Sequence, residues 1–230
     1  MNYIVLLIIL KIMPADRFLS VKDAEELTTT LSKHYKDIHY YLNFKTPIDL
    51  VVCGILSAQT RDTVVNAATP AIFAKYKTAK DYASANAEDL VRLCGSISFA
   101  GNKARNIIAT MKAIQEKYGG KVPNKMEELV ELPGIGRKTA NTILINAYGV
   151  VEGIPVDTWV IKLSPRLGLS KNKNPEKIEQ DLMKVVDKAY WGKWAYVMKT
   201  HGREICKDTP ICSKCPVNKL CPKNGVSKQL

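Results

Sequence analysis

Four of the six cysteines of this 230-residue chain lie in its last 25 residues, where their thiols could hold a metal centre. Their spacing is Cys206-x5-Cys212-x2-Cys215-x5-Cys221. Disulfides are typical of secreted proteins, and we find no secretion signal in this sequence. A structural zinc site usually uses two CxxC pairs, whereas only one is present here. An iron–sulfur cluster accepts four thiolates from one compact loop, so a cluster and zinc both remain possible.

A second chemical signal is the string LPGIGRKTA, which runs from Leu132 to Ala140. Pro133 ends the preceding helix, and Gly134 and Gly136 permit a positive φ and close approach by another backbone. The next helix then begins with unpaired N–H groups, which bind anions. In a basic protein a phosphodiester is the natural anion. The alternative is a plain turn between two helices.

The charge balance favours a polyanionic partner. Lysine and arginine number 34 against 22 acidic residues, which gives a net charge of +12 and a pI near 9.4. Nucleic acid and an anionic membrane surface both fit this charge. The apolar segment from Tyr3 to Leu10 is too short to span a membrane, which takes about 20 residues. We interpret it as a buried extension, or as upstream codons with Met13 as the start; a membrane anchor is the remaining alternative. We expect no membrane partner.

Apolar residues recur at helical spacing along most of the chain, and no segment shows sustained alternation, so we predict an all-α fold. Asn124 is expected to cap a helix with Glu127 and Glu128 in its first turn, Gly149 to end a helix, and Pro175 to begin one. The predicted helices are 21–35, 47–58, 62–76, 86–94, 101–118, 125–131, 137–148, 158–166, 175–188 and 192–205.

The LPGIGRKTA string resembles the helix-hairpin-helix element of the endonuclease III group of DNA glycosylases. The resemblance extends, in family order from about residue 40 to 222, through Leu56–Thr60, Lys103–Ile108, Val156–Thr158 and the C-terminal cysteines. It implies two helical lobes with DNA between them. Residues 39–152 would form the lobe with the hairpin, and residues 1–38 plus 153–230 the lobe with the cluster loop. A monomer in the cytoplasm and nucleoid, or in the nucleus of a eukaryote, is expected.

The resemblance implies a bifunctional enzyme that excises damaged pyrimidines from duplex DNA and cleaves the abasic strand. Lys138 occupies the nucleophile position, where its amine would attack the sugar and form a Schiff base. Asp157 would be the catalytic carboxylate, although its position also predicts a helix N-cap. Trp159 stands where the family usually has histidine, which leaves the preferred base open.

The resemblance also implies how the chain contacts DNA. A flipped base leaves a gap, which Gln59 would fill while Phe99 acts as a wedge. The alternatives are a polar residue at a helix end and a core phenylalanine. The hairpin residues assigned to DNA binding are Gly134, Gly136, Arg137 and Thr139.

The family spacing favours a [4Fe–4S] cluster at Cys206, Cys212, Cys215 and Cys221, although the first gap in the family is commonly six residues. The cluster would have a structural role: it would order the loop so that nearby lysines contact phosphates. His201 would order the segment that leads to the cluster. Cys53 and Cys94 are predicted to be core residues.

Two other functions remain possible from the sequence. One is a monofunctional glycosylase that removes mispaired thymine or adenine, although Lys138 argues against it. The other is a non-catalytic DNA-binding module with structural zinc.

Overall fold

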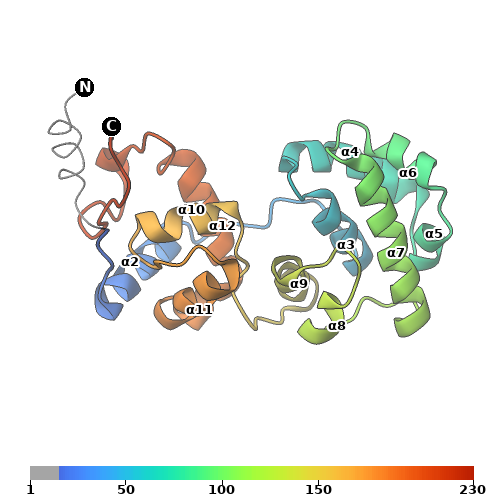
Figure 1. The fold of residues 1–230 in the computed structure, drawn as a ribbon, viewed down its shortest axis with the longest axis horizontal. Coiled ribbons are helices and arrows are strands. Elements are labelled where there is room, and N and C mark those ends of the chain that lie inside the picture. The colour runs from blue at the N-terminus through green and yellow to red at the C-terminus, as the bar shows by residue number, and fades with distance from the viewer. Residues whose placement is uncertain (1–15) are drawn as a thin grey trace, which may run out of the picture. The chain divides into compact units, whose positions relative to one another are not determined.

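The computed structural model describes residues 16–230, and every regular element in that range is helical (Figure 1). This confirms the predicted all-α class. No helix in residues 16–230 combines the length and hydrophobicity of a membrane span. The apolar segment from Tyr3 to Leu10 and the alternative start at Met13 lie outside the described residues. The elements are α2 (Val21–His34), α3 (Pro47–Leu56), α4 (Asp62–Lys75), α5 (Ala79–Ala83), α6 (Ala87–Cys94), α7 (Ala100–Tyr118), α8 (Met126–Val130), α9 (Arg137–Ile143), a π-helical segment (Leu144–Tyr148), α10 (Thr158–Arg166), α11 (Pro175–Val185), a 3-10 turn (Lys188–Tyr190), α12 (Trp191–Glu204) and a 3-10 turn (Cys212–Lys214).

The described residues form two compact units. The first contains residues 16–38 and Val156–Leu230, and the second contains His39–Pro155. The first unit therefore combines α2 with α10, α11 and α12, and the second contains α3 to α9. The chain passes from the first unit to the second and back again, so segments distant in sequence share the first core.

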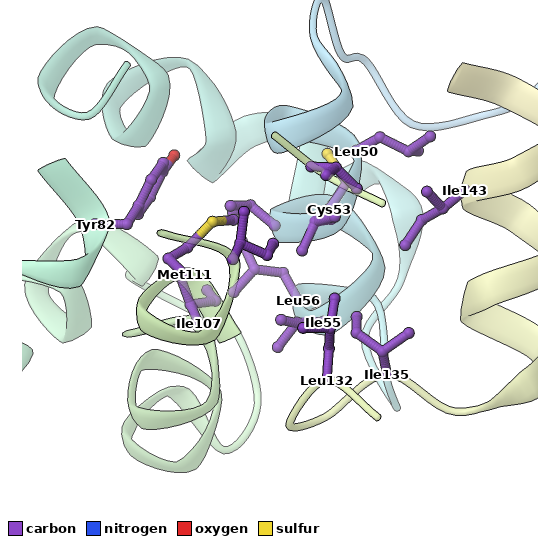
Figure 2. Close-up of a cluster of buried hydrophobic side chains, with 14 of the residues drawn as sticks. Leu50, Cys53, Ile55, Leu56, Tyr82, Ile107, Met111, Leu132, Ile135 and Ile143 are labelled. Atoms are coloured by element: carbon purple, nitrogen blue, oxygen red, sulfur yellow. The ribbon is translucent and has the colours of Figure 1, made fainter. Parts of the chain in front are cut away.

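The core of the second unit is built around α3. Thr46 and Asp49 form a capping box at its start, and Pro47 occupies its first turn. All side chains from Asp49 to Leu56 are buried, so α3 is surrounded by other elements. Figure 2 shows side chains of α7 and of the segment around Leu132 and Ile135 packed near those of α3. The hairpin is therefore anchored to this core.

The first unit has its own core, in which Trp194 of α12 is completely buried. Leu27 and Leu31 of α2 are also completely buried. The hydroxyl of Thr28 in α2 donates to the carbonyl oxygen of Val185 at the end of α11, at 2.8 Å. Helix α2 is thus held to a helix from the C-terminal half of the chain.

The structure corrects several predicted boundaries. Lys125, and not Asn124, is the N-cap of α8, without a side-chain hydrogen bond. The helix predicted over 175–188 ends at Val185, because Val186 is extended and Asp187 caps a separate 3-10 turn. The helix predicted over 137–148 changes from α to π after Ile143.

Helix α5 was not predicted. It has only five residues and begins at a capping box formed by Thr78 and Asp81. That pair is the local signal that could have revealed it, because a Thr followed three residues later by a carboxylate caps a helix start. Gly149 and Pro175 do take their predicted places at a helix end and a helix start.

Candidate DNA-binding and catalytic site

The hairpin between α8 and α9 is a tight turn held by buried apolar residues. The amide of Ile135 donates to the carbonyl oxygen of Leu132 at 3.1 Å, and these two side chains are 4% and 3% exposed. Helix α9 begins immediately afterwards with Gly136 as an N-cap that makes no side-chain hydrogen bond. The start of α9 therefore has no side-chain cap, as an anion site at a helix start requires.

The two glycines of the hairpin differ in backbone conformation and in the space available for a side chain. Gly134 has a φ of +77°, and a Cβ atom there would lie 3.2 Å from Cβ of Asn106. Gly136 has an extended backbone, and nothing in the described part of the chain lies within 4 Å of a Cβ atom built on it. Gly134 is thus needed for the turn itself. The surface over Gly136 is open to another molecule.

Helix α7 supports the hairpin through two residues to which the sequence analysis gave no role. Asn106 packs under Gly134, and the Thr110 hydroxyl donates to the carbonyl oxygen of Pro133 and, at 2.7 Å, to that of Asn106. Asn106 and Thr110 are one helical turn apart. A polar pair at that spacing beside the buried residues Ile107 and Met111 is the signal that could have identified them.

Lys138 lies in the first turn of α9 and its side chain is exposed, as is that of Arg137. The carbonyl oxygen of Lys138 accepts a hydrogen bond from the Thr142 hydroxyl, one turn later in the chain, at 2.9 Å. Thr139 faces the other way. Its Cγ2 atom packs so close to Gly54 of α3 that a Cβ atom at Gly54 would lie 2.7 Å from it. Of the four hairpin residues assigned to DNA, Thr139 thus also anchors α9 to the core.

Asp157 is the N-cap of α10, as predicted. Its Oδ1 atom accepts hydrogen bonds from the amides of Trp159 and Val160 at 2.9 and 3.0 Å. The Oδ2 atom accepts no hydrogen bond within the described part of the chain, and the residue is half-buried. The helix start therefore fixes the carboxylate orientation through one oxygen and leaves the other able to interact with a ligand.

Gln59 lies in the turn that follows α3. The amide of Thr60 donates to the carbonyl oxygen of Ser57 at 3.2 Å, and Gln59 has a φ of +51°. The side chain is exposed. A left-handed backbone at a residue other than glycine is strained, and such strain is concentrated at functional sites.

Phe99 has the same unusual backbone. Its φ is +57°, it is the N-cap residue of α7, and its side chain is 65% exposed. The alternative that Phe99 belongs to the core is therefore wrong. An exposed phenylalanine on strained backbone costs stability, and contact with another molecule would offset that cost.

The four C-terminal cysteines line one hollow in the first unit, together with Ile205 and Leu167. Burial raises the pKa of Cys206 and Cys215, and it raises that of Cys221 to about 11. Metal binding would displace these protons, because thiolates are the ligands. Within residues 16–230, no three His, Cys, Asp or Glu side chains converge on a point that would hold a single metal ion. The four thiols are the candidate ligands of a metal centre in this hollow.

Two nitrogen-bearing side chains approach these sulfurs. Nε2 of His201 lies 3.8 Å from Sγ of Cys215, and Nδ1 of the same ring is 3.2 Å from the Tyr35 hydroxyl. Nη1 of Arg166 lies 3.7 Å from Sγ of Cys206. Such N–H groups around thiolates stabilise their negative charge.

The other two cysteines, Cys53 and Cys94, are completely buried in the second unit, as predicted.

The candidate site residues are divided between the two units. The second unit contains Lys138, the rest of the hairpin, Gln59 and Phe99, and the first unit contains Asp157 and the four cysteines.

A family model described as HhH-GPD superfamily base excision DNA repair protein matches residues 52–188. This match covers more than half of the chain. The chain belongs to the HhH-GPD superfamily. Within it, the similarity to endonuclease III relatives places the chain in the endonuclease III family.

Two such relatives are endonuclease III from Synechocystis sp. and from Bacillus subtilis. The first is 42% identical over 192 residues, which cover 83% of this chain and 88% of the relative. The second is 39% identical over 198 residues, covering 85% and 90%. A solved structure of a trapped endonuclease III–DNA covalent intermediate is also similar, with a TM-score of 0.85 and 36% identity, covering 90% of this chain and 98% of that one.

Proposed function

We propose that this chain is a bifunctional DNA glycosylase and abasic-site lyase of base excision repair that acts on damaged pyrimidines. The observation that carries the proposal is the exposed Lys138 in the first turn of α9, directly after the hairpin, in a chain 33–42% identical to endonuclease III proteins. A trapped covalent intermediate with DNA, as in one similar structure, is what a nucleophilic amine produces.

Lys138 supplies the nucleophile. Its neutral amine attacks C1′ of the damaged nucleotide, and the bond from C1′ to the base breaks as the base leaves with that electron pair. Asp157 takes a proton from the nitrogen, the C1′–O4′ bond breaks, and O4′ leaves with the electron pair and takes up a proton, which gives an iminium ion. The iminium acidifies C2′–H, and removal of that proton breaks the bond from C3′ to the phosphate oxygen. The strand is cleaved by β-elimination without a water nucleophile.

Asp157 stabilises the positive charge that develops on the sugar and accepts a proton from the attacking amine. Its support is the N-cap geometry, which holds Oδ1 and leaves Oδ2 available. A carboxylate already oriented before the reaction needs little reorganisation as charge develops.

DNA binding combines three features of the second unit. The open surface over Gly136 allows a phosphate to approach the start of α9, beside Arg137. Gln59 enters the gap left by the flipped nucleotide, and Phe99 wedges into the stack. The exposure and strained backbone of both residues support these roles.

A [4Fe–4S] cluster would be held by Cys206, Cys212, Cys215 and Cys221. The hollow that these four side chains share and the N–H groups near their sulfurs support this assignment. When bound, the cluster supplies structural cross-linking of the C-terminal loop. Arg166 contributes to this order without the cluster, because its Nη1 donates to the carbonyl oxygen of Lys207 at 2.7 Å. Ordered basic residues of this loop then contact phosphates.

Borohydride trapping tests the function. With a duplex that contains one thymine glycol, the wild-type holoprotein should form a covalent adduct, because reduction fixes the iminium. Lys138→Gln should abolish the adduct and the strand break while retaining binding to the lesion. The matched control is Lys125→Gln, which changes an exposed lysine before α8 and should trap normally. Base release without any adduct from the wild type would instead indicate the monofunctional glycosylase. A panel of single-lesion duplexes then ranks the bases.

A further inference from the structure

Lys103, in the first turn of α7, is a buried lysine without a carboxylate partner. It is 5% exposed, and within the described residues no Asp or Glu pairs with its ammonium group. Burial lowers its pKa. A methionine would fill a similar volume without the cost of desolvating a charge, so the structure retains this ammonium for its hydrogen bonds.

All three donors of the Lys103 ammonium reach the turn that carries Gln59. Nζ donates to the carbonyl oxygens of Leu56 and Ala58 at 2.8 and 2.6 Å, and to the Thr60 hydroxyl at 2.7 Å. These acceptors lie on both sides of Gln59. The Leu56 carbonyl ends α3, where the helix dipole favours a cation.

Lys103 is also joined through its backbone to the first turn of α7, where the other strained residue lies. Its amide donates to the carbonyl oxygen of Phe99 at 3.1 Å, which closes the first turn of α7. In residues 16–230, only Gln59, Phe99 and Lys223 have a positive φ without being glycine. Lys103 therefore bonds directly to the Phe99 backbone and to both neighbours of Gln59.

We propose that Lys103 is a positioning residue that holds Gln59 and Phe99 as one preformed unit, so that the gap-filling amide and the wedge enter the duplex together. This inference rests on the proposed function, because it takes both residues to insert into DNA. A residue that only stabilised α3 would contribute to folding but would not couple the actions of Gln59 and Phe99.

The test measures insertion without turnover. Lys138→Gln holoprotein is saturated with a duplex that carries a tetrahydrofuran abasic analogue opposite 2-aminopurine, whose fluorescence rises when the orphaned base is unstacked. Adding Lys103→Met should reduce this rise by at least about three-fold while affinity for undamaged duplex stays within about two-fold, because a loose unit loses its preorganisation. The matched control, Lys112→Met, removes an exposed lysine of the same helix and should change neither.

A double-mutant cycle separates positioning from stability. Gln59→Ala and Phe99→Ala should be strongly non-additive when Lys103 is present, and additive when Lys103→Met is added. An unchanged fluorescence rise or persistent coupling with Lys103→Met overturns the inference, whatever happens to the melting temperature. If Lys103→Met does not fold, Thr60→Val removes one acceptor with the lysine in place. A reduced rise then supports the inference and an unchanged rise overturns it.

The same measurements distinguish this inference from the proposed function. If Gln59→Ala and Phe99→Ala individually leave the fluorescence unchanged, neither residue inserts, and both their assigned roles and the Lys103 inference fail. If those two variants lower the signal but Lys103→Met does not, only the inference fails. The trapping experiment with Lys138 is independent of all these outcomes.

Discussion

Trp159 of α10 packs against Gly202 of α12 so closely that a larger residue at position 202 would force the ring to move. A Cβ atom built on Gly202 would overlap Cε3 of the indole ring and lie 2.5 Å from its Cζ3 atom. The amide of Trp159 is also one of the two that donate to Asp157, and Nζ of Lys162 lies 5.3 Å from the centre of a Trp159 ring. The absence of a side chain at Gly202 thus makes room for Trp159, whose amide helps to orient the candidate catalytic carboxylate of Asp157.

Gly202→Ala should therefore lower the thermal unfolding midpoint of the holoprotein by several degrees, since overpacking a core typically costs about 1–3 kcal/mol. Adding Trp159→His should recover most of the loss, because the smaller ring leaves room for the methyl group. Differential scanning calorimetry of the wild type, of Gly202→Ala and of the double variant measures this. Equal midpoints for Gly202→Ala and the wild type would show that the ring moves aside without cost.

The two hairpin glycines should give opposite results when changed to alanine. Gly136→Ala should fold with wild-type stability but bind duplex several-fold less tightly, because its added methyl group points where a phosphate would approach. Gly134→Ala should destabilise the fold by about 1 kcal/mol or more, because alanine disfavours its positive φ and contacts Asn106. Chemical denaturation and fluorescence anisotropy on undamaged duplex separate the two effects. Equal binding by Gly136→Ala and the wild type would argue against a phosphate there.

Asp157→Asn should reduce single-turnover excision by at least about a hundred-fold, because the amide cannot stabilise positive charge or accept the proton. Its stability should hardly change, since asparagine is as good an N-cap as aspartate and can keep the hydrogen bonds to Trp159 and Val160. Asp157→Ala is the comparison, and should lose about 1 kcal/mol of stability in addition to activity. A fully active Asp157→Asn enzyme would remove Asp157 from the mechanism.

Purified holoprotein should contain about four irons per chain and little zinc, the stoichiometry of a [4Fe–4S] cluster. After the cluster is removed, iodoacetamide at pH 8 should label Cys212 first, because burial raises the pKa of the other three thiols, Cys206, Cys215 and Cys221. Cys53 should stay unlabelled until unfolding, since burial raises its pKa to about 12. Peptide mass spectrometry reads out each site. Stoichiometric zinc without iron after anaerobic purification would contradict the cluster.

Binding to undamaged duplex should weaken steeply as salt rises. The chain carries a net charge of +12, and each phosphate contact releases a counterion. With several such contacts, affinity should fall by at least about ten-fold between 50 and 200 mM salt. Anisotropy titrations at four salt concentrations give the slope. An affinity that hardly changes would contradict phosphate binding by the hairpin and the C-terminal loop.

Local chemistry in the sequence determined much of this fold. Pro133 and Gly134 specify a tight turn, Asp157 and Pro175 mark helix starts, and Gly149 ends the hairpin helix. Each of these signals acts through hydrogen bonds or backbone angles within about four residues, so it can be read directly from neighbouring residue types. The function followed from Lys138 and the four cysteines only when joined to a family resemblance, because a lone lysine or cysteine group fits several chemistries.

Only the tertiary structure decided which side chains are buried and what they touch. Lys103 binds oxygens 43 to 47 positions earlier in the chain, and Arg166 reaches Cys206 across 40 residues. The sequence left Phe99 equally suited to a core or a surface, and packing placed it at the surface. The contact between Trp159 and Gly202 likewise depends on how α10 packs against α12. Such contacts arise because burying apolar faces fixes how helices pack, and residue spacing along one helix does not specify its partner.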